Sequence, residues 1–284
     1  MIAAAAEAKA PAENFPVAFR VLPERYRRHL MAVYRFARTV DDIGDEVLPG
    51  DPAPEADTAE RLRLLDELDD DLSVLYGGDT PRLDVIAGLA PTVTECGVPD
   101  QLFRDLIQAN RQDQQVTRYT EFDGLLGYCK LSANPVGRIV LHVFGADSPQ
   151  RARLSDHVCT ALQLAEHWQD VAEDARAGRI YLPLEDMTAF GCGEADLAGP
   201  TAGPRLRALM AFQVARASAL LNAGSPLVAT LHGAARAAVA GYVAGGRAAL
   251  AAIEAADHDV LAATPRPGKR RTAVELIRAY TRGR

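Results

Sequence analysis

Two short segments of the chain carry acidic side chains at helical spacing. In the second segment, Glu166, Asp170 and Asp174 follow one another at intervals of four residues, and Gln163 lies about one turn before them. Because residues four apart share one face of a helix, the three carboxylates are predicted to form a column. Like charges at this spacing repel each other, and a hard cation such as Mg²⁺ would relieve the repulsion. One such column is also typical of a solvated acidic helix face.

The first segment, which begins at Tyr34, repeats this pattern. Asp41 and Asp45 lie one turn apart, and Tyr34 and Arg38 continue the same stripe toward the N-terminus. Apolar residues lie among these acids, which indicates a partly buried helix rather than a solvated one. We expect the two acidic segments to face each other and to hold a cluster of Mg²⁺ and diphosphate. Arg38 and Arg179 would bind its phosphate oxygens, because guanidinium groups match their geometry.

Composition narrows the class of protein. The formal net charge of −7 argues against the basic face that nucleic-acid binding needs, so no nucleic-acid partner is expected. The four cysteines are dispersed without a C-x-x-C motif, which predicts reduced thiols in a cytoplasmic protein. We find no signal-peptide pattern and no run of about 18 uncharged apolar residues. The chain is therefore predicted to be soluble, with a peripheral contact at the inner face of a membrane.

Helical periodicity runs through almost the whole chain, and no strand pattern recurs. We predict one all-α domain over residues 13–284, after a leader, residues 1–12, that is expected to be disordered. Pro135 is expected to kink the most apolar helix, which is predicted to line a cavity with Tyr128 near its entrance. Helices are predicted from Glu24 to the loop at Pro49, and over 58–76, 83–95, 99–115, 121–145, 148–178, 205–222, 227–256 and 272–280.

Two kinds of chemistry use paired carboxylate helices. A di-iron bundle needs Glu-x-x-His pairs, but His167 follows Glu166 directly, so their side chains point about 100° apart. Ionisation of a diphosphate fits better. Mg²⁺ can stabilise the charge on the leaving group, and an apolar pocket lined by aromatic rings can stabilise the carbocation. A weaker alternative for the first segment is a surface ion pair between Arg38 and Asp42.

Three segments together resemble the squalene/phytoene synthase family. Residues 34–45, 127–137 and 163–183 read Y-x-x-x-R-x-x-D-D-x-x-D, G-Y-C-K-L-S-A-N-P-V-G and Q-L-x-x-x-x-Q-D-V-x-x-D-x-x-x-G-R-I-Y-L-P. Residues 14–18 and 258–261 are similar to the hopanoid-associated branch of that family. The resemblance implies an all-α, single-domain helical bundle of the class I isoprenoid synthase (prenyl-synthase) type. It also implies a central cavity for an isoprenoid diphosphate.

The resemblance implies roles for the site residues as well. Mg²⁺ and diphosphate would be held by Asp41, Asp45, Asp170 and Asp174. Phosphate contact or closure of the site would fall to Arg38, Arg179 and Tyr181, and the reacting carbons would lie near Tyr34, Tyr128 and Gln163. In the hopanoid-associated branch, presqualene diphosphate would ionise, rearrange and be captured by water as hydroxysqualene, without NADPH. The product would be passed to other enzymes of hopanoid synthesis.

Two positions depart from the family pattern. Glu166 stands where the family usually has Asn, and we expect it to bind the metal, because an oxygen donor is kept. Members that condense two farnesyl diphosphates commonly begin with His-Ser-x-Ser-Phe, whereas residues 11–15 here read P-A-E-N-F. The loss of both hydroxyls favours a substrate with one diphosphate. The alternatives are head-to-head condensation of farnesyl diphosphate and, because of Glu166, a non-catalytic protein that binds prenyl lipids or assists assembly.

Overall fold

The computed structural model describes residues 22–45 and 54–282, and every regular element in these ranges is a helix. Arg118 and Ile180 form an isolated parallel β-bridge, which lies outside any strand. The predicted all-α class is therefore confirmed. The predicted leader and the loop at Pro49 lie outside the described residues. The chain divides into two compact units, Met1–Val116 with Arg138–Asp147 and Thr117–Gly137 with Ser148–Arg284, and each is described by itself.

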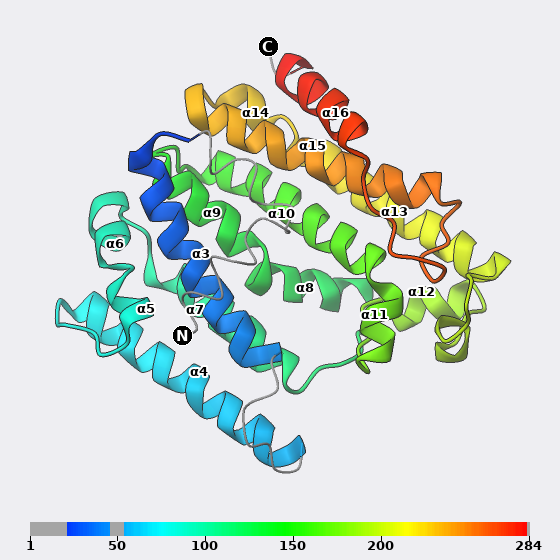
Figure 1. Ribbon diagram of the computed structural model, residues 1–284, viewed down its shortest axis with the longest axis horizontal. Coiled ribbons are helices and arrows are strands. Elements are labelled where there is room, and N and C mark those ends of the chain that lie inside the picture. The colour runs from blue at the N-terminus through cyan, green and yellow to red at the C-terminus, as the bar shows by residue number, and fades with distance from the viewer. Residues whose placement is uncertain (1–21, 46–53, 283–284) are drawn as a thin grey trace. The chain divides into compact units, whose positions relative to one another are not determined.

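The first unit is built on α3 (Glu24–Asp45), α4 (Pro54–Gly77) and α7 (Asp100–Asp113), which pack against one another (Figure 1). Phe36 is fully buried, and its ring meets the ring of Phe103 edge-on with the centroids 5.2 Å apart. The predicted helix 83–95 is divided in two, because Pro91 has no N–H to continue the helical ladder and stands in the first turn of a new helix. The helices of this unit are α3 (Glu24–Asp45), α4 (Pro54–Gly77), α5 (Asp84–Ala87), α6 (Ala90–Cys96) and α7 (Asp100–Asp113).

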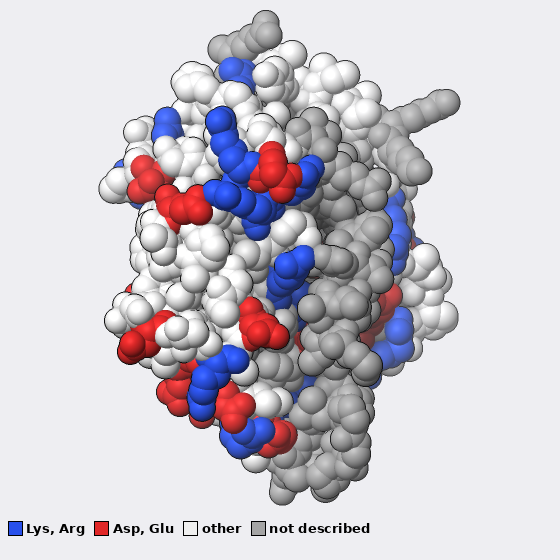
Figure 2. Space-filling view, turned by 60° about the vertical axis from the view of Figure 1, so that its left-hand side comes forward, with Lys and Arg blue, Asp and Glu red and all other residues white. Residues whose placement is uncertain are grey.

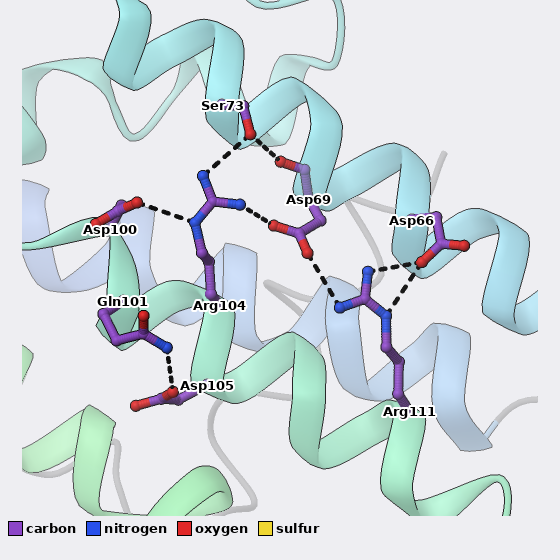
Figure 3. Close-up of polar contacts among 8 residues, drawn as sticks. All are labelled: Asp66, Asp69, Ser73, Asp100, Gln101, Arg104, Asp105 and Arg111. Carbon is purple, nitrogen blue, oxygen red and sulfur yellow. Dashed lines mark hydrogen bonds and ion pairs between the residues drawn. The ribbon is translucent and has the colours of Figure 1, made fainter.

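A network of ion pairs joins α4 to α7 (Figure 3). Asp69 of α4 accepts from Arg104 and from Arg111, whose Nη1 lies 3.0 Å from Asp69 Oδ2. Arg104 also donates to Asp100 at 2.9 Å, and Arg111 donates to Asp66 at 2.6 Å. The side chains of Asp69, Arg104 and Arg111 are only 21, 27 and 21% exposed, so solvent screens these pairs less than fully exposed ones.

We expect the substitution Asp69→Ala to lower the free energy of unfolding by about 1–2 kcal/mol, because two half-buried guanidinium groups lose their shared acceptor. Urea denaturation followed by circular dichroism measures this change. Asp70→Ala removes the neighbouring, exposed carboxylate of the same helix and is the matched control, with an expected change within about 0.5 kcal/mol. Equal destabilisation by the two substitutions would contradict the prediction.

Acidic and basic side chains lie beside each other on the face that Figure 2 shows. Ion pairs of this kind include Arg28 with Glu95 and Arg63 with Glu60, the latter at 2.6 Å. None of the helices in the described ranges combines the length and the apolar character that crossing a bilayer requires.

The second unit is built on three long helices, α10, α13 and α15, of which α10 and α13 share the most extensive contact. A Cβ atom at Gly224 of α13 would lie 2.6 Å from the carbonyl oxygen of Leu154 on α10, so the approach requires glycine. A 3₁₀ helix, η1, covers Glu194–Leu197. The α-helices of this unit are α8 (Phe122–Ser132), α10 (Pro149–Gln169), α11 (Val171–Arg176), α12 (Leu184–Ala189), α13 (Pro204–Gly224), α14 (Leu227–Thr230), α15 (Gly233–Ala255) and α16 (Lys269–Arg282).

Three further predicted helices are each interrupted once. The helix predicted over 121–145 breaks at Ala133, between α8 and α9 (Asn134–Val143), because Pro135 cannot continue the ladder of α8. The prediction of one kinked helix was therefore wrong at this point. The helix predicted over 148–178 breaks at Asp170, where φ is −102° and ψ is 14°, and the helix predicted over 227–256 breaks between α14 and α15.

Candidate functional site

The first acidic motif lies on α3. Asp41 is exposed, whereas Tyr34 and Arg38 are half-buried on the preceding turns. Arg38 Nη2 lies 2.7 Å from Asp42 Oδ1, and the two side chains are 24 and 17% exposed. The ion pair considered as an alternative from the sequence therefore forms, in a partly buried setting. Asp45 is the last residue of α3, and its side chain lies outside the described part of the structure.

Residues of the neighbouring helices support the C-terminal end of α3. Asn110 of α7 is buried, and its Nδ2 donates to Asp41 Oδ1 at 3.3 Å. Gln114 Nε2 donates to the carbonyl oxygen of Gly44 at 3.2 Å, and Arg61 donates to the same oxygen. A Cβ atom at Gly44 would collide with Oδ1 of Asn110, so a larger residue at this position would displace the Asn110 amide. The buried amide of Asn110 thus fixes the orientation of the Asp41 carboxylate.

The second acidic motif keeps its predicted spacing across the break at Asp170. The N–H of Asp170 donates to the carbonyl of Glu166 at 3.0 Å, and the N–H of Asp174 donates to the carbonyl of Asp170 at 2.9 Å. Glu166 is exposed, whereas the other two side chains are half-buried. Burial raises the pKa of Asp174 to about 7, with further contributions from the charges of Asp170, Glu166 and Glu173 against Arg179. Burial and Glu173 also raise the pKa of Asp170.

This donor set fits a hard divalent cation. All of its donors are carboxylate oxygens, which hard cations prefer, and the pKa of Asp174 is raised mainly by burial and further by the neighbouring carboxylates. Within residues 22–45 and 54–282, no group of three or more His, Cys, Asp or Glu side chains is gathered into a closed metal site. Mg²⁺ needs no such cage, because it usually keeps several waters and shares one or two carboxylates with bound phosphates.

A small pocket lies next to Asp174. It is lined by His167, Val171, Asp174, Arg179, Ile180, Tyr181, Leu182 and Leu197. Three residues singled out from the sequence, Asp174, Arg179 and Tyr181, thus share one pocket. The N–H of Arg179 donates to the carbonyl of Asp174 at 2.8 Å, and the charge of Arg179 acts on the Asp174 carboxyl. Arg118 fixes the same turn, because it donates to the carbonyl of Gly178 at 2.6 Å and pairs with Glu194 at 2.8 Å.

Four buried rings form a cluster at this pocket. His167 stacks on Tyr181 with centroids 3.7 Å apart, and Tyr128 lies 6.0 Å from Tyr181 and 5.8 Å from Tyr119. Gln163 Nε2 lies 3.2 Å from His167 Nε2. Burial and the charge of Arg179 lower the pKa of His167 to about 3, so this ring is neutral at physiological pH. The cluster therefore presents uncharged ring faces, which can stabilise a positive charge.

The structure brings seven predicted residues together within the second unit and places the other four on α3. The seven are Tyr128, Gln163, Glu166, Asp170, Asp174, Arg179 and Tyr181, and the four are Tyr34, Arg38, Asp41 and Asp45. Their roles stay predictions. Tyr119, His167 and Asn110 were not predicted as site residues. The spacing of His167 four residues after Gln163 is a signal that points to it, whereas Tyr119 reaches Tyr181 through the bridge at Arg118, which no local pattern indicates.

Comparison with known proteins gives consistent matches. The squalene/phytoene synthase family model matches residues 8–277. The hydroxysqualene synthase of Rhodopseudomonas palustris is 37% identical over 221 residues, which cover 77% of this chain and 71% of that protein. The phytoene synthase of Mycobacterium tuberculosis is 32% identical over 220 residues, which cover 76% of this chain and 69% of that protein.

Solved structures show the same fold. The squalene synthase of Alicyclobacillus acidocaldarius aligns with a TM-score of 0.80 at 36% identity, over 90% of this chain and 94% of that chain. A dehydrosqualene synthase in complex with a ligand aligns with a TM-score of 0.85 at 24% identity, over 99% of this chain and 96% of that chain. The second match is a likeness of fold alone.

Proposed function

Because the chain belongs to the squalene/phytoene synthase family of enzymes, we propose that it is a hydroxysqualene synthase that acts on presqualene diphosphate. The observation that carries the proposal is the column of Glu166, Asp170 and Asp174 beside Arg179 and a cluster of neutral rings. The similarity to hydroxysqualene synthases supports the choice of substrate. Membership of an enzyme family argues against the non-catalytic alternative.

The acidic residues would act on the diphosphate end of the substrate. We propose that the column, with Asp41 and Asp45 of α3, holds Mg²⁺. When bound, Mg²⁺ would neutralise the negative charge that develops on the departing diphosphate. Arg38 and Arg179 would donate to phosphate oxygens. Arg179 and Asp174 line the same pocket, and the charge of Arg179 acts on the Asp174 carboxyl, so both would meet the same ligand.

The rings would act on the carbon end. When the carbon–oxygen bond breaks, its electron pair leaves with the diphosphate and a carbocation remains. The cyclopropane ring rearranges, the oxygen of a water molecule attacks the cation, and a proton is lost to give hydroxysqualene. Faces of Tyr119, Tyr128 and Tyr181 would stabilise the cation. His167 can take part because its lowered pKa keeps it uncharged, whereas an imidazolium would repel the cation.

The product and most of the substrate are hydrocarbon. We therefore propose that the enzyme works in the cytoplasm at the inner face of a membrane, and that it passes its product to the next enzymes of hopanoid synthesis. A central cavity lined by apolar helices, which the family resemblance implies, would shield the cation from premature attack by water.

The test is incubation of the purified protein with presqualene diphosphate and Mg²⁺, followed by mass spectrometry of the lipid extract. Hydroxysqualene formed without NADPH is the expected result. Unchanged substrate, or squalene formed only after NADPH is added, counts against the proposal. Condensation of farnesyl diphosphate is the second candidate, because phytoene synthases are also similar to this chain. Products formed from farnesyl diphosphate alone would favour it.

The substitution Asn110→Ala is expected to lower kcat/KM about tenfold and to raise the Mg²⁺ concentration needed for half-maximal rate, because Asp41 loses its amide donor. Titration of the rate with Mg²⁺ measures both effects. Gln108→Ala changes an exposed amide of the same helix and is the control. An unchanged Mg²⁺ dependence in Asn110→Ala would show that this amide does not position the carboxylate.

A further inference from the structure

The C-terminal helix α16 exposes an apolar surface. Of the five large hydrophobic side chains that are exposed in the described ranges, Phe212 lies on α13 and the other four lie on α16. Ile277 is 65% exposed, more than any other of the five. The four on α16 are Val274, Leu276, Ile277 and Tyr280.

The opposite side of α16 is fixed to its own unit. The helix packs along α15, as Figure 1 shows, and Ala279 is buried there. Arg236 of α15 donates to the carbonyl of Tyr280 at 2.8 Å, and its guanidinium lies 4.8 Å from the centre of the Tyr280 ring. The exposed apolar residues therefore belong to a helix that is held in place rather than to a fraying end.

The same segment is strongly basic. Residues 265–284 contain one acidic residue, Glu275, in a chain whose formal net charge is −7. Glu275 pairs with Arg278 at 2.7 Å, and Arg271 is exposed. Basic residues in this range number seven: Arg266, Lys269, Arg270, Arg271, Arg278, Arg282 and Arg284.

We propose that α16 is an interfacial helix that docks on an anionic phospholipid surface. Val274 and Ile277 would enter the boundary between headgroups and acyl chains, while Arg271 and Arg278 would pair with lipid phosphates. With 14 residues, α16 is too short to span a bilayer and would lie along it. A symmetric contact with α16 of a second copy would instead bring two basic segments together, and like charges disfavour that arrangement.

The loop before α16 contacts the acidic segment. Gln169 donates to the carbonyl of Pro265, and Thr264 Oγ1 donates to Glu173 Oε1 at 3.2 Å. A membrane bound at α16 would therefore contact a helix whose preceding loop is hydrogen-bonded to the candidate acidic segment. This arrangement suits an apolar substrate. This last step rests on the proposed function, whereas the docking itself does not.

Sedimentation of the full chain with phospholipid vesicles tests the proposal. We expect the protein to bind vesicles containing about 30% phosphatidylglycerol at least tenfold more strongly than pure phosphatidylcholine vesicles, and to be released by high salt. The double variant Val274→Asp/Ile277→Asp is expected to lose at least tenfold in binding. Each reversal of Arg271 or Arg278 to Glu is expected to cost at least about fivefold, given about 1 kcal/mol for each basic residue near an anionic surface.

Two matched controls separate α16 from a general change in charge or hydrophobicity. Phe212→Asp removes the exposed apolar side chain of α13, and Arg153→Glu reverses an exposed charge of α10. Both are expected to keep full vesicle binding, and thermal melting verifies that every variant is folded. Equal binding to both kinds of vesicle, or full binding by the α16 variants, overturns the proposal.

Two further readouts complete the test. Light scattering after gel filtration is expected to give the same mass for the wild type and for Val274→Asp/Ile277→Asp. If the wild type were a dimer that bound no vesicles, and if this variant were a monomer, the surface would be assigned to a second copy. That result would overturn the proposal. On substrate dispersed in detergent, the α16 variants are expected to be as active as the wild type. Vesicle binding by a wild type that makes no hydroxysqualene would reject the proposed function and leave the docking supported.

Discussion

The substitution Asp174→Asn is expected to lower kcat/KM for diphosphate release about 10³-fold, equivalent to about 4 kcal/mol of transition-state stabilisation. Asp174 lines the same pocket as Arg179 and Tyr181. The neutral amide keeps the size of the side chain but removes the charge that would hold a cation against the leaving group. The loss should therefore lie in turnover rather than in folding.

Diphosphate release in the presence of Mg²⁺, measured with a coupled phosphatase, gives the rate. Asp123→Asn is the control, because it removes an exposed carboxylate from the first turn of α8 in the same unit. It is expected to change the rate less than twofold. If Asp174→Asn retained more than about a tenth of the activity, Asp174 would not bind the metal, and the proposed mechanism would lose its central residue.

The same substitution is expected to stabilise the metal-free protein. The pKa of Asp174 rises from an ordinary value of 3.8 to about 7, so between these values the folded protein keeps a proton that the unfolded chain has released. The free energy of unfolding therefore falls as the pH rises through this window. Asp174→Asn removes the contribution of Asp174 to this fall. Because the side chain is partly solvated, we expect a gain on the order of 2 kcal/mol at pH 8 that shrinks toward pH 5.

Urea denaturation in EDTA at several pH values measures this gain. Mg²⁺ added at pH 8 should stabilise the wild type, because a ligand that binds only the folded state shifts the equilibrium, and should stabilise Asp174→Asn much less. If the variant were less stable than the wild type at every pH, the negative charge of Asp174 would be compensated within the protein. In that case the column would be a structural feature and not a metal site.

Sequence spacing was sufficient to predict the acidic column, because the information is local. Glu166, Asp170 and Asp174 keep their predicted relation although the helix breaks between them, since the backbone hydrogen bonds still join residues four apart. The break itself was not predictable from spacing. Pro135 marked the position of the interruption between α8 and α9, but a proline indicates equally a kink or a new helix, and only packing decides between the two.

The parts of the site that were missed depend on contacts between distant residues. Asn110 meets Asp41 across 69 positions of sequence, and a single Asn on an apolar helix stripe does not reveal its partner. Tyr119 joins the ring cluster because the Arg118–Ile180 bridge places its segment beside Tyr181. Periodicity reports which face of a helix is buried, but it does not report which element covers that face.

A pair of substitutions tests whether the two acidic motifs act together. Asp41→Asn alone is expected to lower kcat/KM by about 10³, as Asp174→Asn does. If both carboxylates hold one cluster of metal and diphosphate, the double variant should lose little more than either single variant, because the first substitution already destroys the cluster.

Independent roles predict a very different result, since the two losses would multiply to about 10⁶. A radiolabelled substrate under single-turnover conditions allows rates to be measured over the wide range that this comparison needs. Asp70→Asn combined with Asp174→Asn is the control pair, because Asp70 is exposed on α4 and should add nothing. If the loss of kcat/KM in the double variant of Asp41 and Asp174 equalled the two single losses multiplied together, a shared cluster would be contradicted. Strong non-additivity would instead support the proposal that α3 and the α10–α11 segment bind one cluster of metal and diphosphate.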